Sequence, residues 1–284
     1  MSDLIKGLVE NLVRGNPVSR VEEGSYLCGD GLYYCSNCHE PRQMRITILD
    51  EERTVEVLCR CRAAELDDVE KKEKLAKHRE RVQRWRAQAV ADSIWHGFSF
   101  EWDDRKDKGL SDKLRSYVNN FPEMLDKNIG LLLYGGVGTG KTYYAACIAN
   151  GLVDEGRYVM MDTLPSLIAA INANYGERRD YYMGKIAQAH LLVLDDFGVE
   201  RNTEYTLEQT YEIINARYRS GKPLIITTNL SLDEIKTETN PYKKRIFDRV
   251  IEMCLPILVN GGSRRLAISA EKRQAAIDLL EGRV

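Results

Sequence analysis

A glycine-rich octapeptide near the middle of the chain has the spacing of a phosphate-binding loop. Residues 135–142 read GGVGTGKT and fill every fixed position of the pattern G-x-x-x-x-G-K-[ST]. Because glycine has no Cβ, backbone N–H groups can approach a phosphate closely. Lys141 would reach the β- and γ-phosphates of a nucleotide, and Thr142 would bind Mg²⁺ through its hydroxyl. The expected phosphate-binding residues are Gly135, Gly136, Val137, Gly138, Thr139, Gly140, Lys141 and Thr142.

Apolar runs and helical patterns flank this phosphate loop. Residues 129–134 (IGLLLY) resemble a buried strand, and residues 143–150 continue as a helix whose positive N-terminal end would face the anion. The alternation of strand and helix then repeats along the chain. It predicts an α/β fold, in which a parallel sheet is covered by helices and binds ligands at the carboxyl ends of its strands. The expected strands are 157–162, 189–195 and 223–229, and the expected helices are 163–175 and 206–220.

Polar residues end two of these expected strands. Asp195 and Asp196 follow the apolar run 191–194, so that both carboxylates would emerge at the phosphate end of the sheet. Asp195 would hold Mg²⁺ together with Thr142, and Asp196 would polarise the attacking water. Asn229 ends the next strand, where it could hydrogen-bond that water or the γ-phosphate. The sequence therefore predicts hydrolytic chemistry on a nucleoside triphosphate.

Arginines in the last quarter of the chain could complete this site. Asn240 and Pro241 form an N-cap and first-position pair that predicts a helix carrying Arg245 and Arg249 one turn apart. Either arginine could neutralise charge on the γ-phosphate of a neighbouring subunit. The basic cluster 243–245 could instead bind a nucleic-acid backbone or form a solvated face. The segment 261–265 (GGSRR) is expected to open a strand over 266–269, and an arginine there could reach the nucleotide phosphates of its own subunit.

Two cysteine pairs near the start of the chain have the spacing of metal ligands. Between them, the segment 46–57 has alternating apolar residues on either side of an acidic turn, which predicts a hairpin that brings the pairs together. Four thiolates suit structural Zn²⁺, and so small a segment has too little apolar mass to fold without it. Because one pair is tightly spaced, Cys28 or His39 is an alternative ligand. The expected ligands are Cys35, Cys38, Cys59 and Cys61.

Other interpretations of the cysteines are weaker. Covalent haem attachment at the C-x-x-C-H segment 35–39 belongs to exported proteins and would leave the second pair unused. A redox C-x-x-C normally opens a helix, whereas a hairpin is expected here. Cys147 and Cys254 lie in apolar patterns and are expected in buried helices.

The composition favours a cytoplasmic protein. The chain has 284 residues and a formal net charge of −2, so nucleic acid would have to be bound by a local patch and not by a global basic field. No run of about 18 apolar residues occurs, which predicts that the chain does not enter a membrane. In a reducing compartment, the seven cysteines are more easily metal ligands or core residues than disulfides.

Segments at both ends of the cysteine module connect it to the rest of the chain. Residues 4–13 have helical apolar spacing and would pack on the module or dock a partner. Residues 62–92 are dense in both charges, which predicts a solvated helical connector with ion pairs such as Glu70/Lys74 and Glu73/Lys77. The aromatic segment 93–107 could cover an adenine base or pack on the core.

Taken in order, five motifs resemble one known family. The segments GGVGTGKT, LLVLDDFG, ITTNL, RIFDR and GGSRR are similar to those of the AAA+ helicase loaders of the DnaC/DnaI type, including phage-encoded versions, and of the related IstB-type transposition ATPases. The resemblance covers residues 98–269, and covers the cysteine module by type only. It implies a module for binding the helicase at residues 1–61, a linker at 62–97 and an AAA+ P-loop ATPase domain at 98–284.

The resemblance also implies roles for single residues and partners. Family members hydrolyse ATP and load a hexameric replicative helicase onto single-stranded DNA, assembling as several copies on the helicase. One departure is that Asp196 stands where a catalytic glutamate is usual, which bears on the speed of hydrolysis and not on nucleotide binding. The implied roles are ATP·Mg²⁺ binding for Lys141 and Thr142, metal binding for Asp195, a sensor for Asn229, a trans finger for Arg249 or Arg245 and a second sensor for Arg265.

Two further functions compete with a helicase loader. A transposition helper ATPase would share the ATPase core but would need no helicase and no zinc module. A zinc-bearing binding module without turnover would use its nucleotide only to order the fold. A small-molecule kinase is less consistent with the sequence, because no second substrate pocket or arginine-rich lid is evident.

Overall fold

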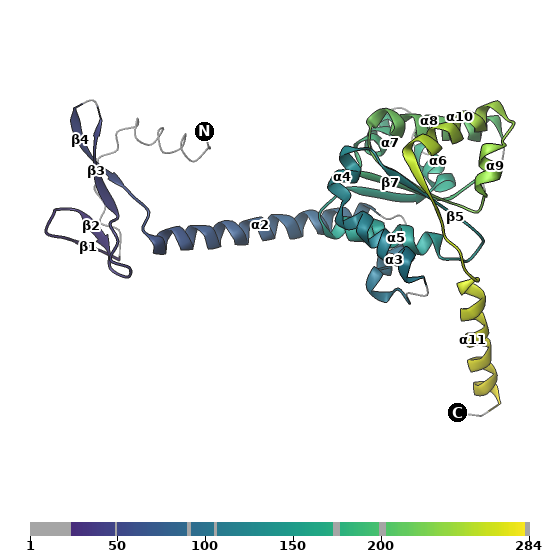
Figure 1. Cartoon of the computed structure of the whole chain (residues 1–284), viewed down its shortest axis with the longest axis horizontal. Helices are drawn as coiled ribbons and strands as arrows, with labels where there is room; N and C mark the ends of the chain where they lie inside the picture. Colours follow the sequence, from purple (N-terminus) through teal and green to yellow (C-terminus); the bar gives the residue numbers. More distant parts are fainter. Residues whose placement is uncertain are drawn as a thin grey trace. The chain divides into compact units, whose positions relative to one another are not determined.

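The computed structural model (Figure 1) describes residues 24–48, 50–89, 92–104, 107–172, 177–198 and 203–281. The chain divides into two compact units, Met1–Lys77 and His78–Val284. The apolar segment 4–13 lies outside the described residues. Within the described part, no helix combines the length and the apolar character needed to cross a membrane.

The first unit consists of two short antiparallel sheets and the start of a helix. The hairpin expected around an acidic turn is present: Ile48 pairs with Glu51, and Asp50 between them has a positive φ of 62°. Cys35 ends one strand of the first sheet, and Cys59 directly precedes the helix. The elements are β1 (Ser25–Leu27), β2 (Tyr33–Cys35), β3 (Gln43–Ile48), β4 (Glu51–Glu56) and α2 (Arg60–Ala89).

Helix α2 is the charged connector that the sequence predicts. Its i,i+4 ion pairs join Lys74 to Glu70 at 2.6 Å and Lys77 to Glu73 at 3.8 Å. The later part of the helix belongs to the second unit. There the Trp85 ring stacks on the Tyr158 ring with centroids 4.5 Å apart, and Arg86 Nε donates to Asp154 Oδ1 at 3.0 Å. These contacts attach the end of the connector to the second unit.

The second unit is built on a five-stranded parallel sheet with the order β6-β7-β8-β5-β9. The α/β fold with a parallel sheet is therefore confirmed. Its strands are almost wholly apolar because both faces are covered. The strands are β5 (Gly130–Tyr134), β6 (Val159–Thr163), β7 (Leu191–Phe197), β8 (Leu224–Thr228) and β9 (Cys254–Leu258).

Helices cover both faces of this sheet (Figure 1). Alternate strand residues contribute to two separate cores, one under α3 and α5 and the other under α6, α8 and α10. The helices are α3 (Lys108–Asn119), α4 (Phe121–Asp126), α5 (Lys141–Asp154), α6 (Leu164–Asn172), α7 (Glu177–Gln188), α8 (Glu204–Ser220), α9 (Leu232–Lys236), α10 (Pro241–Met253) and α11 (Arg264–Leu280).

Two expectations about the end of the chain were wrong. The segment 266–269, expected as a strand, lies in α11, which Ser263 caps by accepting a hydrogen bond from Leu266 N at 3.3 Å. The fifth strand is β9, and it contains Cys254, which was expected in a helix. Strong helix formers follow residue 269 and extend the helix through this segment. As an edge strand, β9 tolerates Pro256, which has no N–H to donate.

The aromatic segment before the sheet packs against α5. It forms two short 3₁₀ helices, η1 (Ser93–Gly97) and η2 (Phe100–Trp102), and both Trp95 and Phe100 are buried. Asn150 Nδ2 donates to the carbonyls of Trp95 and Phe98, both at 2.8 Å. By contrast, Trp102 is 80% exposed.

Candidate nucleotide site and cysteine cluster

The phosphate loop joins the carboxyl end of β5 to the first residue of α5. Three of its glycines have backbone conformations that other residues rarely adopt, with φ of 146° at Gly135, 81° at Gly138 and 102° at Gly140. A Cβ at Gly135 would lie 2.4 Å from Val259 O, and one at Gly138 would lie 2.3 Å from Ser263 Oγ. The second distance also shows that α11 begins beside the phosphate loop.

Lys141 lies in the buried centre of the loop, with only 5% of its surface exposed. Its Nζ donates to the carbonyls of Gly135 and Gly136 at 3.0 and 2.7 Å, and to Asn229 Oδ1 at 2.7 Å. The structure thus brings together two predicted site residues that lie 88 positions apart in the chain. A lysine ammonium held at this place can bind the phosphates of a nucleotide.

Asp195 lies beside Thr142, as the sequence predicts. Thr142 Oγ1 donates to Asp195 Oδ2 at 3.1 Å, and Asp195 is only 2% exposed. Burial raises the pKa of the Asp195 carboxyl, while hydrogen bonds from Thr227 and Thr142 oppose that rise. A carboxylate and a hydroxyl in contact offer the oxygen ligands that Mg²⁺ prefers, so these residues fit the predicted metal.

Asp196 lies inside β7 and not after it, which corrects the expected end of that strand. Leu194 pairs with Ile226 but Phe197 pairs with Thr228, so β7 contains one extra residue at a β-bulge. Asp196 has a positive φ of 53° and an exposed side chain. The bulge thus exposes one acid at the carboxyl end of the sheet while the preceding acid remains buried.

The three arginines of the prediction have different surroundings. The Arg249 guanidinium lies over the rings of Tyr211 and Tyr218 of α8, at 4.5 and 5.5 Å from their centroids. Arg245 is exposed one turn earlier on α10. Arg265 lies in the first turn of α11, and its side chain is outside the described part of the structure.

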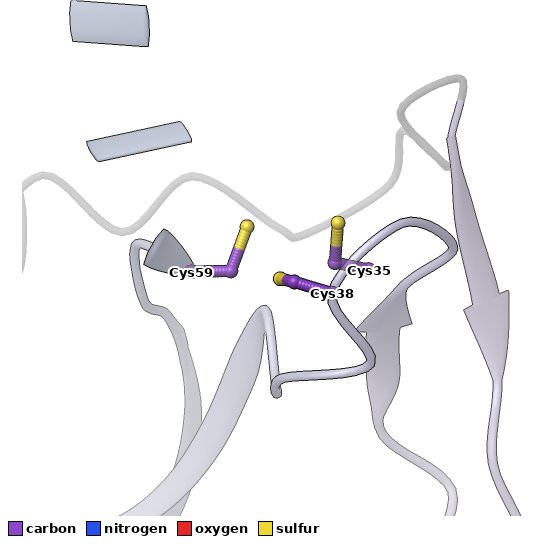
Figure 2. A group of neighbouring side chains, drawn as sticks. All are labelled: Cys35, Cys38 and Cys59. Atoms are coloured by element: carbon purple, nitrogen blue, oxygen red, sulfur yellow. The ribbon is translucent and has the colours of Figure 1, made fainter. Parts of the chain in front are cut away.

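Three of the four predicted zinc ligands come together (Figure 2). The sulfur atoms of Cys35, Cys38 and Cys59 all lie within 4.8 Å of one another. Cys61, in the first turn of α2, forms a hydrogen bond with the Cys38 thiol that raises the Cys61 pKa, and its Sγ accepts from Asn37 Nδ2 at 3.2 Å. Soft thiolates at this spacing could hold zinc.

The two alternative ligands have other surroundings. Cys28 is exposed, and His39 Nδ1 is hydrogen-bonded to the Tyr26 hydroxyl at 3.2 Å. Among the described residues, the cluster of possible metal ligands consists of Cys35, Cys38 and Cys59, and it includes neither alternative.

Sequence reasoning missed Thr227 of β8, whose hydroxyl donates to Asp195 Oδ1 at 2.6 Å. The available signal was polarity: two threonines interrupt an otherwise apolar strand just before Asn229. It also missed Arg217, a fully buried arginine near the end of α8. A helical arginine ordinarily indicates a solvated face, so the sequence contained no clear signal for that one.

The phosphate loop after β5, together with the acid on β7 and the amide after β8, defines a nucleotide-binding P-loop protein of the AAA+ class. The chain belongs to the family of IstB-like ATP binding proteins, whose model matches residues 60–274.

Individual relatives agree with this assignment. The chain is 28% identical over 165 residues to the replicative helicase loader DnaC of Escherichia coli (strain K12), a match that spans 56% of this chain and 64% of DnaC. It is 30% identical over 148 residues to an ATP-binding protein in an insertion sequence of Mycobacterium tuberculosis, spanning 50% and 57%. A crystal structure of DnaI matches the fold with a TM-score of 0.53 and 23% identity, over 64% of this chain and 99% of the other. The chain thus spans less than two thirds of the length of DnaC and of the insertion-sequence protein.

Proposed function

We propose that this protein is an ATP-dependent loader that places a hexameric replicative helicase onto single-stranded DNA. The observation that supports it most is the contact of Lys141 with Asn229 and of Thr142 with Asp195, in a chain related to a protein named as a replicative helicase loader. Turnover of ATP would act as a switch of assembly and not as metabolic chemistry.

The described contacts support a division of labour in the site. Lys141 and the phosphate loop would hold the triphosphate, and Thr142 with Asp195 would hold Mg²⁺. When bound, Mg²⁺ neutralises the charge that develops on the phosphates. Asp196, exposed at the bulge, would polarise the water, and Asn229 would orient it. Because aspartate is shorter than glutamate, we expect slow hydrolysis.

The arginines would extend the site to assembled copies of the chain. Exposed Arg245, or Arg249 after leaving the tyrosines of α8, would serve as the trans finger of a neighbouring subunit. Arg265 would contact the phosphates from its own subunit, since the backbone at the start of α11 adjoins the phosphate loop. These roles require several copies of the chain on one helicase.

The cysteine module would contact the helicase. Residues 1–61 would form that module around Zn²⁺ held by the cysteine cluster, residues 62–97 would link it to the ATPase, and residues 98–284 would form the ATPase domain. The charged, exposed surface of α2 between Arg60 and Lys77 supports a linker role for this part of the helix.

The test is the native mass of the protein mixed with the hexameric replicative helicase of its host and Mg·ATP. A complex of one helicase hexamer with several copies of this protein, lost in Lys141→Ala, would support the loader. Two unassociated species at micromolar concentrations, with a folded wild-type protein, would contradict it.

A transposition helper ATPase is the second candidate, because the family description and the insertion-sequence relative both favour it. It predicts ATP-dependent assembly on double-stranded DNA and capture of a transposase, with no helicase complex. A binding module without turnover is distinguished from both by phosphate release: it predicts background rates with and without single-stranded DNA.

A further inference from the structure

Two adjacent threonines of β8 join this strand to the bulge of β7. Thr227 and Thr228 are both fully buried, and they point to opposite faces of the sheet. Thr227 Oγ1 donates to Asp195 Oδ1 at 2.6 Å and accepts from Asp196 N at 2.9 Å. Thr228 Oγ1 donates to Phe197 O at 2.7 Å. Each hydroxyl thus bridges the two strands beside the inserted residue.

The direction of the Thr227 hydrogen bonds follows from their chemistry. A hydroxyl has one proton to donate, and a backbone N–H can only donate. Because Asp196 N donates to Thr227, the Thr227 proton goes to Asp195. With Thr142 donating to the other oxygen at 3.1 Å, both oxygens of the Asp195 carboxylate have a donor, and the plane of this carboxylate is defined.

The same hydroxyl supports the backbone of the next acid. The register shift leaves Asp196 in a left-handed conformation with φ of 53°, which L-residues seldom adopt. Its N–H donates to the Thr227 hydroxyl. Without the Thr227 hydroxyl, this part-buried donor would lose that partner, and the bulge would lose a contact that stabilises it.

We propose that Thr227 is a positioning residue, which aligns the metal-binding carboxylate of Asp195 and the backbone of Asp196 through one hydroxyl. Its hydroxyl contacts both acids, and it would act on the nucleotide and the metal only through them. The proposal rests on the nucleotide chemistry proposed for these acids, and it is independent of whether the partner is a helicase. It explains why a strand that is otherwise apolar has a hydroxyl at this position.

The test compares Thr227→Val with Thr228→Val, a matched variant on the same strand that also removes one buried hydroxyl. The affinity for a fluorescent ATP analogue is measured with and without Mg²⁺, beside phosphate release and thermal unfolding. A hydrogen bond to a charged group corresponds to about 10- to 100-fold in an equilibrium constant. We expect Thr227→Val to need about tenfold more Mg²⁺ for half-maximal analogue binding and to keep its affinity without Mg²⁺.

The controls separate positioning from general stability. Thr227→Ser keeps the hydroxyl and should need the same Mg²⁺ concentration as the wild type. Thr228→Val should lower the melting temperature and should also need the wild-type Mg²⁺ concentration. If Thr227→Val does not fold, Thr227→Cys offers the same comparison, because its S–H is a weak donor.

Three results would overturn the inference: equal Mg²⁺ requirements for Thr227→Val and the wild type, equal shifts in both valine variants, or a wild-type affinity that does not respond to Mg²⁺. Absence of a helicase complex in the mass experiment, with the Thr227 effect present, would refute only the loader.

Discussion

Removal of Arg217 should strongly destabilise the second unit. It lies in the last turn of α8, is 0% exposed, and donates five hydrogen bonds to backbone carbonyls. The acceptors are the carbonyls of Ile186, Ala189, His190 and Pro223. Burial lowers the pKa of Arg217 to about 9, so it is still charged at neutral pH. The guanidinium therefore joins the end of α7 to the segments that enter β7 and β8.

The expected magnitude follows from these contacts. Arg217→Met keeps the apolar stem but leaves four buried carbonyls without this partner, at about 1–3 kcal/mol for each group that finds no other. Because the buried charge disappears as well, the net loss should resemble that of other broken buried charge networks, about 3–5 kcal/mol. For a unit of this size, that corresponds to a fall of about 6–20 °C in Tm. Arg217→Lys should also lose most of the stability that Arg217 contributes, because one ammonium cannot reach all four acceptors.

The assay is urea unfolding of the full chain followed by circular dichroism, with thermal unfolding beside it. Arg219→Met, two residues further on the same helix and exposed, is the control and should change stability by less than about 0.5 kcal/mol. The reasoning is refuted if Arg217→Met remains within about 1 kcal/mol of the wild type, or if Arg217→Lys is as stable as the wild type.

Three further predictions concern the histidine, the cysteines and the sensor. His190 Nδ1 accepts from Tyr158 N at 2.9 Å, and burial lowers its pKa below the ordinary 6.5. Stability in urea should therefore fall as the pH drops below about 6.5, and should fall less in His190→Asn, which keeps an acceptor. A strong chelator, or the substitution Cys59→Ser, should remove the bound zinc, which native mass spectrometry would measure. Loss of zinc should also make residues 24–77 susceptible to protease, and a wild-type protein without metal would contradict this. Asn229→Ala should lower phosphate release by about tenfold or more with nucleotide affinity little changed; equal losses of both would contradict a sensor role.

The sequence predicts that the phosphate loop and the polar residues at the ends of the strands lie close together, because their placement depends on local patterns and on the parallel sheet. The phosphate loop requires glycines at particular backbone angles, and Lys141 is fixed by its position directly after them. The parallel arrangement of the strands then places the residues after β7 and β8 at one edge of the sheet. Contacts such as Thr142 with Asp195 follow from topology alone, even though 53 positions separate them.

The remaining features depend on tertiary contacts that no local pattern encodes. Local propensity over 254–269 does not distinguish strand from helix. Strand pairing does: β9 pairs with the edge of β5, and the later segment forms α11. The bulge at Asp196 could not be predicted from a local pattern, because the Thr227 hydroxyl that accepts from Asp196 N lies on the neighbouring strand. Arg217 looks like a surface residue until the carbonyls of three other segments surround it.

The contacts of Lys141 indicate how the binding of a phosphate would affect the positions of Asp195 and Asp196. Its ammonium donates to two loop carbonyls and to Asn229, all of which are neutral acceptors. A phosphate oxygen carries charge and forms stronger hydrogen bonds, so a bound triphosphate should displace at least one of these acceptors. We expect Asn229 to be the acceptor that is displaced, because its side chain can rotate whereas the loop carbonyls are held by the backbone. Because Asn229 lies two residues after Thr227, its release would act on the strand that orients Asp195, and phosphate binding and acid alignment would be linked through β8.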